Sequence, residues 1–90
     1  MTHTQNATGG RFSITVDGSE AVADYVLENG NRMICTHTYS PPELRGRGIA
    51  EQLVRAALAE ARTRNWRVVP ACSYVAAFIQ RHPEFSDLMT

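Results

Sequence analysis

The residues best suited to chemistry lie between Arg45 and Ala50, where the chain reads Arg-Gly-Arg-Gly-Ile-Ala and then enters a long amphipathic segment. Backbone N–H groups at the start of a helix lack intrahelical partners and lie at the positive end of the helix dipole, so they bind anions. Gly46 and Gly48 remove side chains that would keep a ligand away from that backbone. Arg45 and Arg47 add planar guanidinium groups that match phosphate oxygens. The pattern predicts a pyrophosphate site.

Other common ligand-binding patterns do not fit the sequence. A Walker loop needs a lysine before its Ser or Thr, and the chain contains no lysine. The glycines do not spell the Gly-x-Gly-x-x-Gly of dinucleotide-binding folds, and no acidic residue follows a second parallel strand. His3, His37 and His82 lack the spacing of metal ligands, so we expect no metal site.

Four segments have the character of β-strands. Residues 11–16 alternate apolar and polar side chains, and residues 21–28 form a second strand. Asn29-Gly30 is a strong hairpin signal, which pairs the second strand antiparallel with residues 32–39. Residues 66–71 form a short fourth strand. Within the third strand, alternation places on one face Met33, Cys35, His37 and Tyr39.

Two segments have helical periodicity. The first begins at Ile49, directly after the loop, and carries one apolar stripe. The second begins after Ser73, which we expect to act as its N-cap, and ends before Pro83. Residues 1–10 are polar and are expected to form a flexible lead, and residues 11–90 are expected to form a single domain. The order βββαβα predicts an α+β fold with a four-stranded sheet and two helices.

In this context, the Arg45–Ala50 loop resembles the acyl-coenzyme A loop of the GNAT N-acetyltransferase superfamily, Arg/Gln-x-x-Gly-x-Gly/Ala. Strand, bend, loop and helix also follow in the superfamily's order. His37-Thr38, Pro70–Tyr74 and His82–Phe85 resemble segments of the short, single-domain YjdJ-type members, so the similarity extends over residues 11 to 88. The resemblance implies a compact GNAT-like mixed sheet, acetyl-CoA or coenzyme A as co-substrate, and an amine as acetyl acceptor.

The resemblance also implies which residues hold coenzyme A. The loop would bind the pyrophosphate, and pantetheine would lie along residues 36–40, with backbone hydrogen bonds from Thr38 and Tyr39. Phe78 and Arg81 would line the channel from the last helix, although core packing and surface charge explain these two residues almost as well. The implied cofactor-binding residues are Thr38, Tyr39, Arg45, Gly46, Arg47, Gly48, Ile49, Ala50, Ser73, Phe78 and Arg81.

Three side chains are candidates for catalysis. Cys72 resembles a cysteine of the short members, and it could form an acetyl-cysteine, act by lying close to the thioester, or simply pack in the core. Tyr74 lies on the helix that supplies a general acid in many superfamily members, with a half-buried structural tyrosine as the alternative. His37 could deprotonate the incoming amine or be a structural residue. The resemblance favours direct transfer in a ternary complex.

Two departures from the superfamily pattern affect the acceptor side. Short members usually carry an acidic residue after the His-Thr pair, where this chain has Tyr39 and Ser40. Larger members have two helices after the first strand, whereas Asp17-Gly-Ser19 joins the first two strands directly. The acceptor is therefore not defined by the sequence, and a non-catalytic sensor of coenzyme A or acetyl-CoA is the alternative function.

Composition limits the possible partners. The chain has nine basic and nine acidic residues, so its net charge is zero, and this does not favour nucleic-acid binding through its arginines. Apolar runs are shorter than a transmembrane helix, and the first residues do not resemble a secretory signal. The two cysteines do not suggest a disulfide framework. We expect a cytoplasmic protein with reduced thiols and no membrane partner, as a monomer or homodimer.

Overall fold

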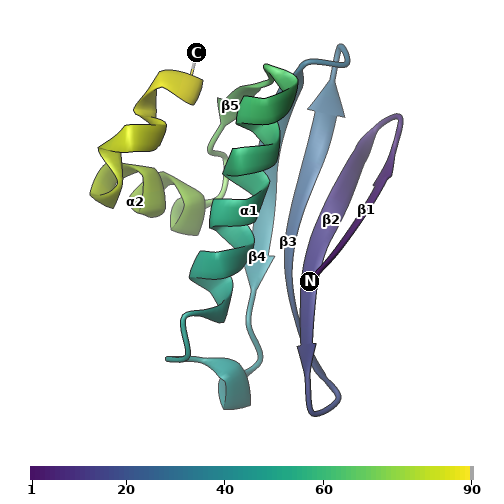
Figure 1. Cartoon of the computed structure of the whole chain (residues 1–90), viewed down its shortest axis with the longest axis vertical. Coiled ribbons are helices and arrows are strands. Elements are labelled where there is room, and N and C mark those ends of the chain that lie inside the picture. Colours follow the sequence, from purple (N-terminus) through teal and green to yellow (C-terminus); the bar gives the residue numbers. More distant parts are fainter. Residues whose placement is uncertain (90) are drawn as a thin grey trace.

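The computed structural model describes residues 1–89 and is built on one mixed sheet of five strands with both long helices on the same side (Figure 1). The strands lie in the order β1-β2-β3-β4-β5, and only the β4–β5 pair is parallel. The elements in chain order are β1 (Thr2–Asn6), β2 (Gly9–Val16), β3 (Ser19–Glu28), β4 (Arg32–Tyr39), a 3-10 turn (Pro42–Leu44), α1 (Ile49–Arg64), β5 (Arg67–Val69), α2 (Ser73–Arg81) and a second 3-10 segment (Pro83–Leu88). The predicted α+β class and the order of the later elements are confirmed.

The predicted hairpin between β3 and β4 forms at Asn29-Gly30. Both residues have positive φ, 55° and 72°, which Asn and Gly adopt at low cost, and with Asn31 they form the three-residue loop between the paired Glu28 and Arg32. Asp17 and Gly18 join β2 to β3 with φ values of 51° and 81°. Because both turns are so short, β2, β3 and β4 form a continuous antiparallel meander.

The strand count differs from the prediction because β1 lies in the segment that we expected to be a flexible lead. Thr2 to Asn6 pair with Ser13 to Gly9 along the edge of the sheet. Only His3 of this strand turns inward, where its ring stacks on Phe12 at 3.9 Å and its Nε2 lies 2.7 Å from the Tyr25 hydroxyl. Burial lowers the pKa of His3, so the ring favours its neutral form. The other side chains of β1 are polar and exposed, so the segment lacks the alternation of apolar and polar residues that predicts a strand.

Helix α1 covers the sheet and supplies the centre of the core. Its apolar stripe packs across β2, β3 and β4, and Leu53 and Leu58 have no exposed surface. Helix α2 packs beside α1 and completes the core with Val75, Phe78 and Ile79. The start of α1 is thereby fixed over the end of β4, and this places the Gly-rich loop next to the strand.

A β-bulge changes the direction of the last side chains of β4. Asp24 pairs with His37 but Tyr25 pairs with Cys35, so Thr36 is an extra residue on β4. Before the bulge, Met33 and Cys35 point into the core, as predicted. Beyond it, the half-buried Thr38 takes the core side, whereas His37 and Tyr39 are exposed and stack on each other. The prediction that Met33, Cys35, His37 and Tyr39 share one face is therefore wrong.

The close contact between β1 and Tyr25 gives a test of the fifth strand. A Cβ on Gly10 would lie 2.6 Å from the Thr4 carbonyl oxygen and 2.6 Å from the Tyr25 hydroxyl oxygen, so Gly10→Ala must push β1 or Tyr25 aside. We expect this overpacking to lower the free energy of unfolding by about 1–3 kcal/mol in urea titrations. Ser13→Ala, on the opposite face of β2, should change it by less than about 0.5 kcal/mol. Equal stability of Gly10→Ala and the wild type would contradict the pairing.

Candidate functional site

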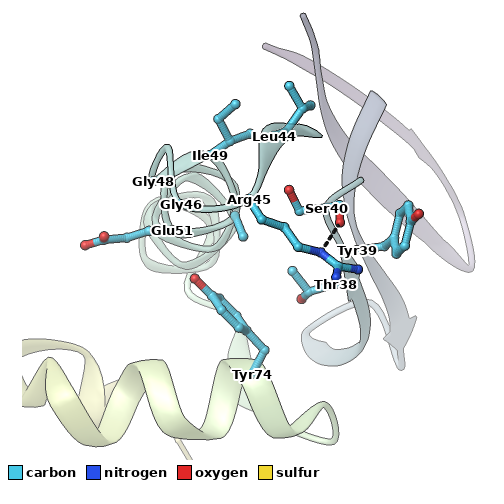
Figure 2. A pocket seen from close by; sticks show the side chains of 11 residues that line it. Thr38, Tyr39, Ser40, Leu44, Arg45, Gly46, Gly48, Ile49, Glu51 and Tyr74 are labelled. Atoms are coloured by element: carbon cyan, nitrogen blue, oxygen red, sulfur yellow. Dashed lines mark hydrogen bonds between the residues drawn. The ribbon is translucent and has the colours of Figure 1, made fainter. Parts of the chain in front are cut away.

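The candidate site is a pocket between the end of β4 and the start of α1. Its volume is about 440 Å³, and Tyr74 of α2 closes one side of it (Figure 2). The lining residues come from the strand end, the loop and the first turns of both helices: Thr38, Tyr39, Ser40, Leu44, Arg45, Gly46, Gly48, Ile49, Ala50, Glu51 and Tyr74. The Gly-rich loop, the end of the strand before it and the second helix therefore meet at one place.

The loop backbone has the conformation that makes its amides accessible. Gly46 and Gly48 have φ values of 79° and 72°, in the left-handed region, and Gly48 is the N-cap of α1. The N–H of Gln52 donates to the Gly48 carbonyl at 3.1 Å, which is the first hydrogen bond of the helix. The amides of Ile49 to Glu51 precede that bond, and no described side chain caps this end of α1. These amides can hold an anion.

The two loop arginines occupy different surroundings. Arg45 extends across the pocket, and its Nε donates a hydrogen bond of 2.9 Å to the Ser40 carbonyl (Figure 2). The Ser40 hydroxyl is buried beside it and has no hydrogen-bond partner among residues 1–89. Arg47 is exposed and does not line the pocket. The structure therefore brings one of the two predicted phosphate-binding arginines to the pocket and leaves the other at the loop surface.

Several other predicted site residues lie away from the pocket. Phe78 has no exposed surface and packs between the His82 and Phe85 rings, at centroid distances of 4.3 and 5.9 Å. The core interpretation of Phe78 therefore fits the structure better than a channel role. Arg81 is exposed and does not line the pocket, but its charge acts on Tyr74, whose pKa it lowers.

The start of α2 also differs from the prediction. Ser73 is the exposed first residue of α2, and the N-cap position belongs to Cys72, so the prediction that Ser73 caps the helix is wrong. The reason is that the Cys72 N–H donates to the Cys35 carbonyl at 2.8 Å and continues the pairing of β4 with the strand beside it. The helix can begin only after that bond.

His37 and Tyr39 show how the bulge divides the end of β4. The His37 ring is exposed on the face opposite the helices and stacks on Tyr39 at 6.4 Å with an interplanar angle of 7°. The Tyr39 ring points away from the pocket in Figure 2, so Tyr39 borders the pocket mainly with its backbone. This agrees with a backbone role for Tyr39, whereas His37 lies outside the pocket.

Cys72 lies behind the pocket lining, between Thr38 and the start of α2. Its Sγ is 3.7 Å from the Thr38 hydroxyl oxygen. Burial opposes ionisation of the thiol, but the Val75 amide, the Thr38 hydroxyl and the amides of Tyr74 and Thr38 outweigh it and lower the Cys72 pKa. The Cys72 side chain makes no capping hydrogen bond of normal geometry to α2, so the helix amides act on it as nearby dipoles.

Two ionisable groups near Cys72, Tyr74 and Cys35, have raised pKa values. Burial raises the pKa of Tyr74, and the charge of Arg81, which lowers it, does not cancel this effect. Burial also raises the pKa of Cys35 to about 12. Both groups stay protonated at neutral pH, whereas the nearby Cys72 is shifted toward its thiolate. Opposite shifts in neighbouring groups are typical of sites that separate an acid from a base or nucleophile.

Two residues that line the pocket, Leu44 and Glu51, were not predicted from the sequence, and Ser40 was predicted only as the last residue of the segment that holds pantetheine. Ser40 lies at the bend that ends β4, and Glu51 is in the first turn of α1. Their closeness in sequence to the Gly-rich loop could have identified both as pocket residues. Residues 1–89 contain no group of three or more His, Cys, Asp or Glu side chains that could hold a metal ion. None of the helices in this part of the chain has the length and apolar character needed to cross a membrane.

Comparison with known proteins agrees with this fold and with the resemblance in the loop. The chain is similar to the solution structure of a GCN5-like protein from Staphylococcus aureus, with a TM-score of 0.72 over 99% of this chain and 87% of that one. Sequence identity is 20%, so this likeness shows the fold. The family model of the GCN5-related N-acetyl-transferases matches residues 11–88. The chain therefore belongs to the GCN5-related N-acetyltransferase family.

Proposed function

We propose that this chain is an acetyl-CoA-dependent N-acetyltransferase that transfers an acetyl group to a small-molecule or protein amine by direct attack in a ternary complex. Membership of the family supports acetyl transfer in general. One observation carries the proposal for this chain: the open amides at the start of α1, the end of β4, Arg45 and Tyr74 all border one pocket. That arrangement provides an anion site and a candidate proton donor for one ligand.

In this proposal, coenzyme A is held by backbone more than by side chains. The amides of the loop and of the first turn of α1 bind the pyrophosphate. Arg45 gives up its hydrogen bond to the Ser40 carbonyl and donates to a phosphate oxygen instead. The backbone of Thr38 and Tyr39 bonds the pantetheine amides. The thioester then lies toward Tyr74 and Cys72, because Tyr74 lines the same pocket and Cys72 lies beside Thr38 of β4.

The proposed reaction delivers a proton to the sulfur of coenzyme A and removes one from the nitrogen of the amine. The nitrogen of a neutral amine attacks the thioester carbonyl carbon, the C–N bond forms and the C–S bond breaks. The leaving CoA thiolate takes a proton from the Tyr74 hydroxyl, which burial keeps protonated by raising its pKa. The nitrogen loses a proton as the amide forms, and that proton restores the Tyr74 hydroxyl. His37 is less suited to act on the amine from inside the pocket, because it lies on the other face of the sheet.

A second candidate function is a non-catalytic sensor that binds coenzyme A or acetyl-CoA. It is favoured by the connection between β2 and β3, where Asp17 and Gly18 form a tight turn and supply no covering element for an acceptor. The sensor and the enzyme share the cofactor site and differ only in turnover. Binding therefore tests both functions, and product formation separates them.

Calorimetric titration with acetyl-CoA and with coenzyme A tests the shared site. We expect saturable binding to the wild type and at least about tenfold weaker binding to the Arg45→Ala/Arg47→Ala double variant, because the charge-assisted contact of Arg45 to phosphate and the nearby positive charge of Arg47 are lost. Arg32→Ala removes an exposed arginine at the β3–β4 hairpin, paired with Glu28, and should bind like the wild type. If neither ligand bound the wild type, both the enzyme and the sensor would be ruled out.

Tyr74→Phe tests the proton donor. We expect kcat for acetyl transfer to fall about 100-fold, which is the lower end of the usual contribution of general acid catalysis, with little change in the Kd of coenzyme A. Tyr39→Phe is the matched control, since its ring points away from the pocket, and should keep wild-type kcat. The acid role of Tyr74 fails if both variants turn over at the wild-type rate.

Mass spectrometry of the intact protein tests direct attack. After mixing with acetyl-CoA in the absence of an amine, we expect Cys72 to remain unmodified, because acetyl transfer awaits the acceptor. Cys72→Ala provides the control for acetylation elsewhere in the chain. Stoichiometric acetylation of Cys72 that an added amine then discharges would replace direct attack by a covalent intermediate.

A further inference from the structure

The Thr38 side chain has a different environment from its backbone. The bulge at Thr36 turns Thr38 to the helix side of β4, where it borders the pocket and also a small core cavity lined by Val54 and Val75. Its hydroxyl lies 3.7 Å from the Cys72 sulfur. The sequence predicted only a backbone role for this residue. A hydroxyl at this place can accept a hydrogen bond from a thiol and donate one to a thiolate.

We propose that Thr38 is a positioning residue that holds the Cys72 sulfur as a thiolate, and that this thiolate accepts the proton of the attacking amine. The inference rests on the proposed acetyl transfer. In the proposed step, the acceptor arrives as an ammonium ion, its N–H bond breaks, and the proton moves to Sγ. The products of the step are a neutral amine, free to attack the thioester, and a Cys72 thiol that donates to the Thr38 hydroxyl. Tyr74 supplies the other proton, to CoA.

The position of Cys72 and its electrostatics both favour a base there, since its sulfur, at the start of α2, lies 3.7 Å from the Thr38 hydroxyl oxygen. Amides at the start of α2 and the Thr38 hydroxyl favour its anion, whereas Cys35 on β4 and Tyr74 on α2 stay neutral because burial raises their pKa values. The sulfur is stabilised by hydrogen-bonding groups rather than by a cation. A base held this way can take up a proton without breaking an ion pair. His37, the other candidate base, is on the opposite face of the sheet.

The first experiment measures the Thr38–Cys72 contact without any need for turnover. The rate of Cys72 alkylation by iodoacetamide is followed against pH by mass spectrometry, with Cys72→Ala to assign the label. Thr38→Val replaces the hydroxyl by a methyl of similar shape, so the thiolate loses a donor. We expect its titration midpoint to move to higher pH and alkylation at pH 7 to slow by about three- to tenfold.

Two further variants guard against a structural explanation. Thr38→Ser keeps the hydroxyl and should restore the wild-type midpoint, even if it lowers the melting temperature. Thr15→Val makes the same chemical change at an exposed site on β2, away from the bulge, and should leave the midpoint unchanged. An unshifted midpoint in Thr38→Val, or an equal shift in Thr15→Val, would overturn the positioning role.

The second experiment tests the base itself. With acetyl-CoA and a lysine-containing tripeptide as acceptor, the acidic limb of the pH profile of kcat/KM should move in Thr38→Val by the same amount as the alkylation midpoint. If alkylation shifts and the acidic limb does not, Thr38 positions Cys72 but the thiolate is not the base. Failure of the proposed function is distinguishable, because it appears as absent CoA binding or turnover in the wild type while the alkylation result stands.

Discussion

The β-bulge at Thr36 is the local constraint on which the arrangement of the site depends. One extra residue in β4 reverses the alternation of its last three side chains, so Thr38 faces the helices while His37 and Tyr39 face outward. Without it, a histidine would face Cys72 and the threonine would be exposed. The bulge also leaves the Tyr39 and Ser40 backbone to border the pocket. A single irregularity therefore decides which chemical groups meet at the end of the sheet.

The starts of two helices then supply most of the electrostatics. The first turn of α1 offers open amides to a ligand, and the first turn of α2 favours the anion of Cys72. Both turns border or adjoin the same pocket because α1 packs over β4 and α2 packs against both. Positive ends of helices cost no side-chain entropy to place, and this suits a chain of 90 residues with a small core.

The features predicted correctly from the sequence are those governed by local backbone chemistry. Asn29-Gly30 specifies its own turn, and the apolar spacing after Ile49 specifies α1. The missed features depend on contacts between distant segments. Thr2–Asn6 pairs with β2 although only His3 faces inward, and an extra residue at Thr36 leaves no mark on an otherwise alternating strand. Helical spacing likewise places Phe78 on the inner side of α2, but the spacing alone does not tell whether the ring packs in the core, as it does, or lines a channel.

The two sides of the proposed reaction differ in how well the fold defines them. The ligand that carries phosphate meets a preformed pocket, because helix α1 must begin with open amides wherever its loop lacks a capping side chain. An acceptor meets no equivalent element, since β2 passes to β3 through Asp17 and Gly18 alone. Among the described residues, contacts to the acceptor can then come from the rim of the pocket. Selectivity on that side must therefore depend on few residues, among them Glu51 and Tyr74, which both line the pocket.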